Sequence, residues 1–177
     1  MIITLCGFMG SGKSSVGAEL ARRLGWHFID LDNAVEESAG MTITEIFAAG
    51  NEQGFRKRES LVLNEILLAY SCKGSNLVLA LGGGTPVIPE NRKAIREKTF
   101  CVYLQASADT LFGRLEHDCG GRPVLTKKAS GNPEALYERI SCLLDARAGF
   151  YEECSRLTIN TDSLGIGGTA AEIISSL

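Results

Sequence analysis

The run from Gly7 to Ser14, GFMGSGKS, fits the pattern GxxxxGK[ST] and follows a short apolar stretch, Ile2 to Cys6, that reads as a strand. Glycines let such a loop curl so that successive backbone N–H groups surround phosphate oxygens. Behind the loop, Ser14 to Leu24 has apolar residues at helical spacing, so a helix would point its positive end at a nucleotide. A glycine-rich turn with a chance Lys-Ser would not explain these flanking elements. The sequence therefore predicts a phosphate-binding loop.

The composition fits one domain. A chain of 177 residues that is 45% hydrophobic can build one sizeable core, so we expect a single domain over residues 1–177. The net charge of −3 gives no general attraction to nucleic acid or to an anionic membrane. The chain also lacks an apolar stretch of about 18 residues and the pattern of a signal peptide. We therefore expect a cytoplasmic protein with no nucleic-acid or membrane partner.

The six cysteines are scattered and form no CxxC pair and no Cys/His spacing of the zinc type. We expect reduced thiols that mainly serve packing.

Short apolar runs alternate with helical patterns along the chain. Five runs predict strands: Ile2–Cys6, Phe28–Asp30, Leu77–Leu81, Phe100–Leu104 and Leu157–Ile159. Helices are expected in Ser14–Leu24, after the capping box Thr42–Glu45, in Glu52–Leu68, in Glu90–Lys98 and from Pro133 towards Tyr151. Strands separated by helices indicate an α/β fold, in which helices cover both faces of a parallel sheet.

The segment Asp118–Asn132 differs in composition from the rest of the chain, because it is rich in glycine and carries Arg122, Lys127 and Lys128. Such a composition is typical of a mobile flap over an anion.

Two carboxylates, Asp30 and Asp32, stand at the end of the second predicted strand. An extended backbone would place both on one side, and the carboxyl end of a parallel strand faces the ligand crevice. Mg²⁺ and an acceptor hydroxyl both need carboxylate oxygens there. The other interpretation is that Asp32 caps a following helix. Beside a phosphate-binding loop we favour the functional role.

An arginine and three glycines suggest where a second substrate would bind. Arg56 and Glu59 are three residues apart on a predicted helix and share a face, although a solvated ion pair explains them equally well. Gly82, Gly83 and Gly84 directly follow the third predicted strand. Backbone N–H groups there, together with an arginine, would bind a small carboxylate. The alternative for the glycines is a simple tight turn.

Taken in order, these motifs resemble the shikimate kinase family, whose members are small proteins of the nucleoside monophosphate kinase-like P-loop fold. The match spans nearly the whole chain. It is carried by Gly7–Ser14, Asp30-x-Asp32, Phe55-Arg56-x-x-Glu59, Gly82–Gly84, Arg122–Leu125 and Arg147–Tyr151. The resemblance implies a three-layer αβα fold with a five-stranded parallel sheet in the order 2-3-1-4-5, a shikimate-binding segment at about 32–61 and a mobile lid at about 114–131. It also implies phosphorylation of the 3-hydroxyl of shikimate by MgATP, a step towards chorismate and the aromatic amino acids.

The resemblance assigns residues to the nucleotide. The triphosphate would be held by Gly10, Ser11, Gly12, Lys13, Ser14 and Ser15. Ser14 would ligate Mg²⁺, and Asp30 would assist the metal through water. Arg122 would swing in with the lid to reach the phosphates, and Arg114 would stack near the adenine.

It also assigns residues to the acceptor. Asp32 would bind the shikimate hydroxyls and is the candidate base. Arg56, Gly83 and Arg147 would clamp the carboxylate, with Glu59 orienting Arg56 and with Gly82 and Gly84 flanking the clamp. Phe47 and Phe55 would either form walls for the ring or belong to the core.

Two other functions remain open at this stage. Gluconate kinase, or another P-loop kinase of small metabolites, shares the fold, but the triple glycine and Phe55-Arg56-x-x-Glu59 are not expected together there. A P-loop module that senses ATP would not need Asp32, Arg56 and Arg147 in one pocket. No exposed apolar stripe argues for a dimer, so we expect a monomer.

Overall fold

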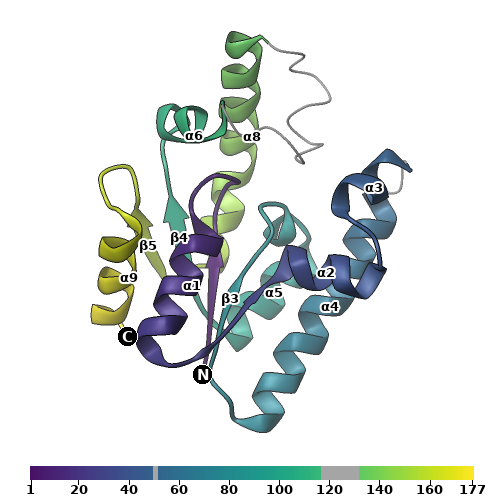
Figure 1. Ribbon diagram of the computed structural model, residues 1–177, viewed down its shortest axis with the longest axis vertical. Helices are drawn as coiled ribbons and strands as arrows, with labels where there is room; N and C mark the ends of the chain where they lie inside the picture. Colours follow the sequence, from purple (N-terminus) through teal and green to yellow (C-terminus); the bar gives the residue numbers. More distant parts are fainter. Residues whose placement is uncertain (50–51, 117–131) are drawn as a thin grey trace.

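The computed structural model describes residues 1–49, 52–116 and 132–177, and its centre is a five-stranded parallel sheet (Figure 1). The strands are β1 (Ile2–Cys6), β2 (His27–Asp30), β3 (Leu77–Ala80), β4 (Phe100–Gln105) and β5 (Leu157–Asn160). They lie in the order β2-β3-β1-β4-β5, and each neighbouring pair is parallel. This is the order that the family resemblance implies.

Helices cover both faces of this sheet. On one face lie α1 (Lys13–Leu24) and α9 (Ile166–Ser175); on the other lie α4 (Glu52–Lys73), α5 (Pro89–Lys98) and α8 (Pro133–Cys154) (Figure 1). Successive residues of β1 face opposite layers, because side chains alternate along a strand. Ile3 and Leu5 belong to the cluster that contains Val16 and Leu20 of α1, whereas Cys6 belongs to the opposite cluster. The three-layer αβα prediction is confirmed.

The register aligns the carboxyl ends of the central strands. Leu5 of β1 pairs with Ala80 of β3, and Asp30 of β2 pairs with the same Ala80. The chain leaves all three strands at one edge of the sheet, so the phosphate-binding loop, the carboxylates and the glycines begin side by side. An open parallel sheet presents its ligand crevice at this edge.

Three shorter helices and one 3₁₀ turn complete the described structure. They are α2 (Leu31–Ala39), α3 (Ile43–Ala48), α6 (Ala108–Leu115) and η1 (Thr85–Val87). The predicted capping box at α3 is confirmed, because the Thr42 hydroxyl accepts from the backbone N–H of Glu45 at 3.2 Å and the Glu45 carboxylate accepts from that of Thr42 at 2.7 Å. Two paired donors at a helix start stabilise it locally.

Sequence patterning did not identify α6 or α9. The first has only eight residues, and the second contains Gly167 and Gly168, which weaken a helix by about 1 kcal/mol each relative to alanine. α9 forms nevertheless, because Ala170 and Ile173 are fully buried in the cluster that contains α1. Tertiary packing overrides weak intrinsic propensity here.

Three cysteines pack together in the core. Cys6, Cys101 and Cys154 are buried free thiols, and the sulfurs of Cys101 and Cys154 lie 4.0 Å apart. Burial raises the pKa of the Cys6 thiol, so it stays protonated. Cys72 and Cys142 are exposed and also unpaired. None of these five forms a disulfide; the three buried thiols pack in the core as expected, the two exposed ones do not, and Cys119 lies outside the described residues.

Within the described parts of the chain, no helix has both the length and the apolar character needed to cross a bilayer.

Candidate active site

The phosphate-binding loop joins β1 to α1 as predicted. Gly10 and Gly12 have φ angles of +83° and +95°, a region that side chains other than glycine rarely adopt, and Gly12 is the N-cap of α1. The Lys13 ammonium is largely buried and donates to the carbonyl oxygens of Gly7 and Phe8 at 3.0 and 2.9 Å. The loop thus encloses a cation at the positive end of a helix, an arrangement that binds phosphate.

A cavity of about 530 Å³ opens beside this loop. Its lining includes Gly10 to Ser15, Asp30, Asp32, Gly83 and Arg114, all of which the sequence had assigned to the site. Arg114 of α6 spans one end of the cavity, because its guanidinium donates to the carbonyls of Gly10 at 3.2 Å and Thr161 at 2.9 Å. The Ser11 hydroxyl is buried and has no hydrogen-bond partner among the described residues.

One wall of the cavity was not anticipated. Thr161, Leu164, Gly165, Ile166 and Thr169 line it from the loop after β5 and the start of α9. Their place in the sequence could have revealed them, because they follow the carboxyl end of a parallel strand, where ligands bind.

Asp30 and Asp32 both reach the cavity, but not through an extended backbone. Asp30 is the N-cap of α2, and its carboxylate accepts from the backbone N–H of Asp32 at 3.0 Å and from the Ser14 hydroxyl at 2.5 Å. Asp32 lies in the first turn of α2. The expectation of a shared strand face was therefore wrong. The expected cap exists, at Asp30 and not at Asp32.

The electrostatics of Asp32 differ from those of an ordinary surface carboxylate. Burial raises the pKa of Asp32 to about 6, the nearby Asp30 carboxylate adds to the rise, and the Lys13 ammonium opposes it. A carboxyl group with a pKa near 6 is ionised at neutral pH and still able to take up a proton. These are the properties of a general base.

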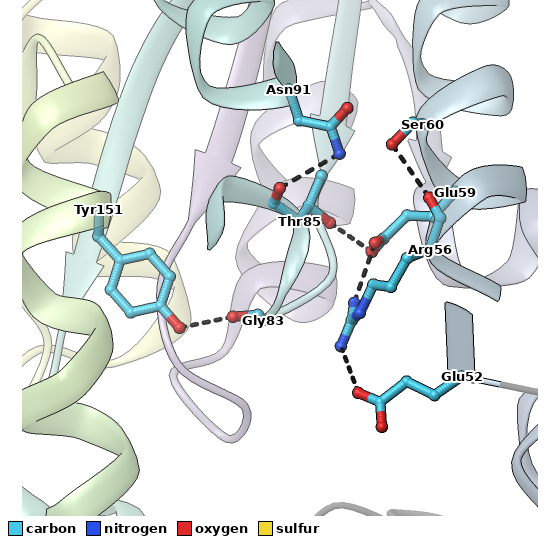
Figure 2. Close-up of polar contacts among 8 residues, drawn as sticks. All are labelled: Glu52, Arg56, Glu59, Ser60, Gly83, Thr85, Asn91 and Tyr151. Carbon is cyan, nitrogen blue, oxygen red and sulfur yellow. Dashed lines mark hydrogen bonds and ion pairs between the residues drawn. The ribbon is translucent and has the colours of Figure 1, made fainter. Parts of the chain in front are cut away.

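Arg56 and Glu59 form a largely buried ion pair on α4 (Figure 2). Glu59 is fully buried and accepts from Arg56 at 2.9 Å through one carboxylate oxygen and from the Thr85 hydroxyl at 2.7 Å through the other. This is not the solvated pair of the alternative interpretation. The expected orienting role of Glu59 has a physical basis, because two directional contacts fix its carboxylate.

The glycines after β3 make room for these side chains. A Cβ on Gly82 would lie 2.7 Å from an Asp32 carboxylate oxygen and 2.8 Å from one of Glu59, and a Cβ on Gly84 would lie 2.6 Å from both terminal nitrogens of Arg56. The space is therefore filled by the protein's own charged groups. Asp32, Glu59 and Arg56 converge on this loop, and a side chain on Gly82 or Gly84 would displace them.

Gly83 faces the other way. A Cβ there would lie 3.3 Å from the backbone nitrogen of Met9 in the phosphate-binding loop, and Gly83 itself lines the cavity. Its carbonyl accepts from the Tyr151 hydroxyl at 2.6 Å (Figure 2). Tyr151 was not among the predicted site residues, because its partner is 68 residues away in sequence.

Arg147 is half-buried on α8, one turn before Tyr151. Burial raises the pKa of Tyr151 above its ordinary range, and the Arg147 guanidinium opposes that rise. This places Arg147 beside the tyrosine that holds Gly83. Neither Arg147 nor Arg56 lines the 530 Å³ cavity.

Phe47 and Phe55 are buried and pack against each other with ring centroids 5.2 Å apart. They belong to the core cluster, and the Phe55 ring also supports the Arg56 guanidinium at 5.1 Å.

Arg122, the expected phosphate-contacting residue of the lid, lies outside the described residues, as do Lys127 and Lys128 and most of the expected lid at about 114–131.

Comparison with known proteins decides between the remaining interpretations. The family model described as shikimate kinase matches residues 9–177. The chain belongs to the shikimate kinase family. A shikimate kinase of Symbiobacterium thermophilum is 40% identical over 177 residues, which is 100% of this chain and 96% of the relative. One of Legionella pneumophila is 38% identical over 99% of this chain and 93% of the relative.

Solved structures agree with this membership. A shikimate kinase from Acinetobacter baumannii, described as a complex with shikimate, has a TM-score of 0.87 at 34% identity and covers 99% of this chain and 91% of its own. A gluconokinase from Sinorhizobium meliloti has a TM-score of 0.56 at 19% identity over 98% of this chain and 93% of its own. The second likeness shows a shared fold alone. The findings therefore favour shikimate kinase over the gluconate kinase alternative.

Proposed function

We propose that this chain transfers the terminal phosphoryl group of ATP to the 3-hydroxyl of shikimate and that the residues around the cavity perform the transfer. One observation carries the proposal. The raised-pKa carboxyl of Asp32 and the phosphate-binding loop line the same cavity, so a hydroxyl on Asp32 would face a phosphate held by Lys13. Phosphoryl transfer requires such an alignment of nucleophile and phosphate.

The nucleotide would lie along Gly10 to Ser15. The backbone N–H groups of the loop and the N-terminus of α1 would hold its phosphates, and the buried Ser11 hydroxyl would gain a partner. The Lys13 ammonium would stabilise charge on the phosphates. Arg114, between the Gly10 and Thr161 carbonyls, would border the base.

Ser14 and Asp30 suit Mg²⁺ because both offer oxygen donors at the phosphate end of the cavity, and Mg²⁺ prefers oxygen ligands. When bound, the ion would neutralise charge that develops on the phosphate oxygens. Asp30 is held by its cap contact to Asp32, so its carboxylate stays beside the Ser14 hydroxyl.

Shikimate would bind beside the Gly82–Gly84 loop and contact Asp32, Gly83, Arg56 and Arg147, with Gly82 and Gly84 making room for Asp32 and Arg56. The binding segment at about 32–61 would then comprise α2, α3 and the first turns of α4. Arginine guanidinium groups bind carboxylates through paired hydrogen bonds. Asp32 would accept a hydrogen bond from the reacting hydroxyl and hold its proton as the phosphoryl group transfers.

The test is ADP release by the purified protein with MgATP in the presence of shikimate, of gluconate and of no acceptor. Stimulation by shikimate alone supports the proposal. Stimulation by gluconate would assign the acceptor pocket to another metabolite, and no stimulation would leave an ATP-binding module. Lys13→Ala should abolish the signal, and Lys93→Ala, which removes an exposed lysine of α5, should leave it unchanged.

A further inference from the structure

The loop that follows β3, Gly82 to Thr85, is held from two sides by buried side chains (Figure 2). Tyr151 of α8 contacts it at Gly83, and Glu59 of α4 contacts it at Thr85. These two helices also carry Arg147 and Arg56, the arginines assigned to the acceptor carboxylate. The loop thus contacts both helices that carry the two arginines, α4 with Arg56 and α8 with Arg147.

The Tyr151 contact is short, and its donor comes from a side chain in the protein interior. The residue is fully buried, and its hydroxyl donates to the Gly83 carbonyl at 2.6 Å. Because burial raises the pKa of Tyr151, the phenol stays protonated and remains a donor throughout the working pH range. Arg147 lies one turn earlier on the same helix and acts on this phenol. Tyr151 therefore ties Gly83 to α8, the helix that also carries Arg147.

The Thr85 contact continues to Arg56. The Thr85 hydroxyl, also fully buried, donates to one Glu59 oxygen at 2.7 Å, and the other oxygen accepts from Arg56 at 2.9 Å. The turn is closed by the backbone N–H of Thr85, which donates to the Gly82 carbonyl at 3.1 Å. Without the Thr85 hydroxyl, one oxygen of a fully buried carboxylate would lose its partner, and the Glu59 side chain would be free to turn.

We propose that Tyr151 and Thr85 are positioning residues for the acceptor: by tying the Gly82–Thr85 loop to α8 and α4, they set the spacing between Arg147 and Arg56 and so match the clamp to a small carboxylate. The hydroxyls of Tyr151 and Thr85 contact Gly83 and Glu59, and neither residue is assigned to the reaction itself. The inference rests on the proposed function, since it concerns how that site recognises its acceptor.

The experiment compares Tyr151→Phe and Thr85→Val with the wild type in steady-state kinetics for both substrates. Each variant removes one hydroxyl and keeps the shape of the side chain. We expect the KM for shikimate to rise roughly three- to tenfold, the effect of losing one positioning hydrogen bond. The KM for ATP should stay within about twofold, because the phosphate-binding loop keeps its own contacts.

Two controls separate positioning from general stability. Tyr103→Phe removes the hydroxyl of a neighbouring buried tyrosine, whose ring centroid lies 5.2 Å from that of Tyr151, and should leave the KM for shikimate unchanged. Thr85→Ser keeps a hydroxyl at the same position and should restore the KM lost in Thr85→Val. If the hydroxyls served stability alone, the variants would have lower melting temperatures. They would not raise the KM for shikimate in Tyr151→Phe and Thr85→Val while leaving it unchanged in Tyr103→Phe and Thr85→Ser.

The outcomes are distinguishable. A wild type without shikimate-dependent ADP release would overturn the proposed function. An active wild type, with the KM for shikimate unchanged in Tyr151→Phe and Thr85→Val or raised equally in Tyr103→Phe, would overturn the positioning role. If Tyr151→Phe does not fold, the comparison of Thr85→Val with Thr85→Ser tests the positioning role. A KM for shikimate that is raised in Thr85→Val and stays raised in Thr85→Ser would contradict the inference.

Discussion

The Ser14 hydroxyl donates a 2.5 Å hydrogen bond to the Asp30 carboxylate, so the second residue of α1 is joined to the residue that ends β2. The other Asp30 oxygen caps α2 by accepting from the backbone N–H of Asp32 at 3.0 Å. One side chain therefore holds the phosphate-binding loop, the sheet and the helix of the candidate base in a fixed relation.

Asp30→Asn and Asp30→Ala should separate the two roles of this side chain. Asparagine caps helices as well as aspartate does but carries no charge. Alanine can neither cap the helix nor supply a charge. Both variants should raise the Mg²⁺ concentration needed for half-maximal activity by roughly tenfold or more. Only Asp30→Ala should also lose about 1 kcal/mol of stability. Mg²⁺ titrations of activity and denaturant unfolding without nucleotide provide the two readouts, and an unchanged Mg²⁺ requirement would refute the metal role.

Asp32→Asn should lose kcat and gain stability at neutral pH. The pKa of Asp32 is about 6 in the folded protein against an ordinary 3.8, so the folded state binds the proton more tightly than the unfolded state. The contribution of Asp32 to stability therefore falls as pH rises from about 4 to about 6 and stays low above that. The variant should be more stable than the wild type at pH 7, by at most about 3 kcal/mol. Unfolding curves at pH 4 and pH 7 measure this, and an equal difference at both values would contradict the assigned pKa.

Gly84→Ala should weaken the acceptor clamp and leave the nucleotide site intact. The added Cβ would lie 2.6 Å from the terminal nitrogens of Arg56, and a guanidinium at the end of a flexible side chain shifts before the backbone does. The KM for shikimate should rise roughly tenfold or more. Gly149→Ala is the matched control, because nothing lies within 4 Å of its Cβ and a helical alanine stabilises by about 1 kcal/mol. Similar KM values in the two variants would argue against the close packing of Arg56 on the loop.

The five cysteines in the described part of the chain should divide into two reactivity classes. Cys72 and Cys142 are exposed, whereas Cys6, Cys101 and Cys154 are buried thiols. A thiol reagent on the native protein should modify Cys72 and Cys142, and modification of the buried three should require unfolding. Peptide mapping after alkylation with and without denaturant measures this. Native labelling of Cys101 would show that the core opens readily.

The sequence predicted most of the fold because short continuous apolar runs mark the main strands and apolar residues at a period of about 3.6 mark the main helices. It placed Asp30 and Asp32 at the site for an incorrect reason, because the position of a helix start is among the least reliable parts of such a prediction. α9 was missed because its glycines hide a helix that forms through contacts with α1.

What sequence reasoning could not supply were contacts between distant segments. The Tyr151 hydroxyl and the Gly83 carbonyl meet across 68 residues, and the Thr85 hydroxyl meets Glu59 across 26. Neither pair leaves a local pattern. The glycines after β3 were assigned to the right place, but the structure adds that Gly82 and Gly84 accommodate Asp32, Glu59 and Arg56.

The central claim is transfer of a phosphoryl group to one hydroxyl of shikimate, and the most direct measurement is the structure of the product. Purified protein, MgATP and shikimate should be incubated and analysed by ³¹P and ¹H nuclear magnetic resonance. The account predicts one phosphate ester per ADP, attached at the 3-oxygen of shikimate. Inorganic phosphate as the only new phosphorus signal besides ADP, or an ester at another oxygen, would contradict it.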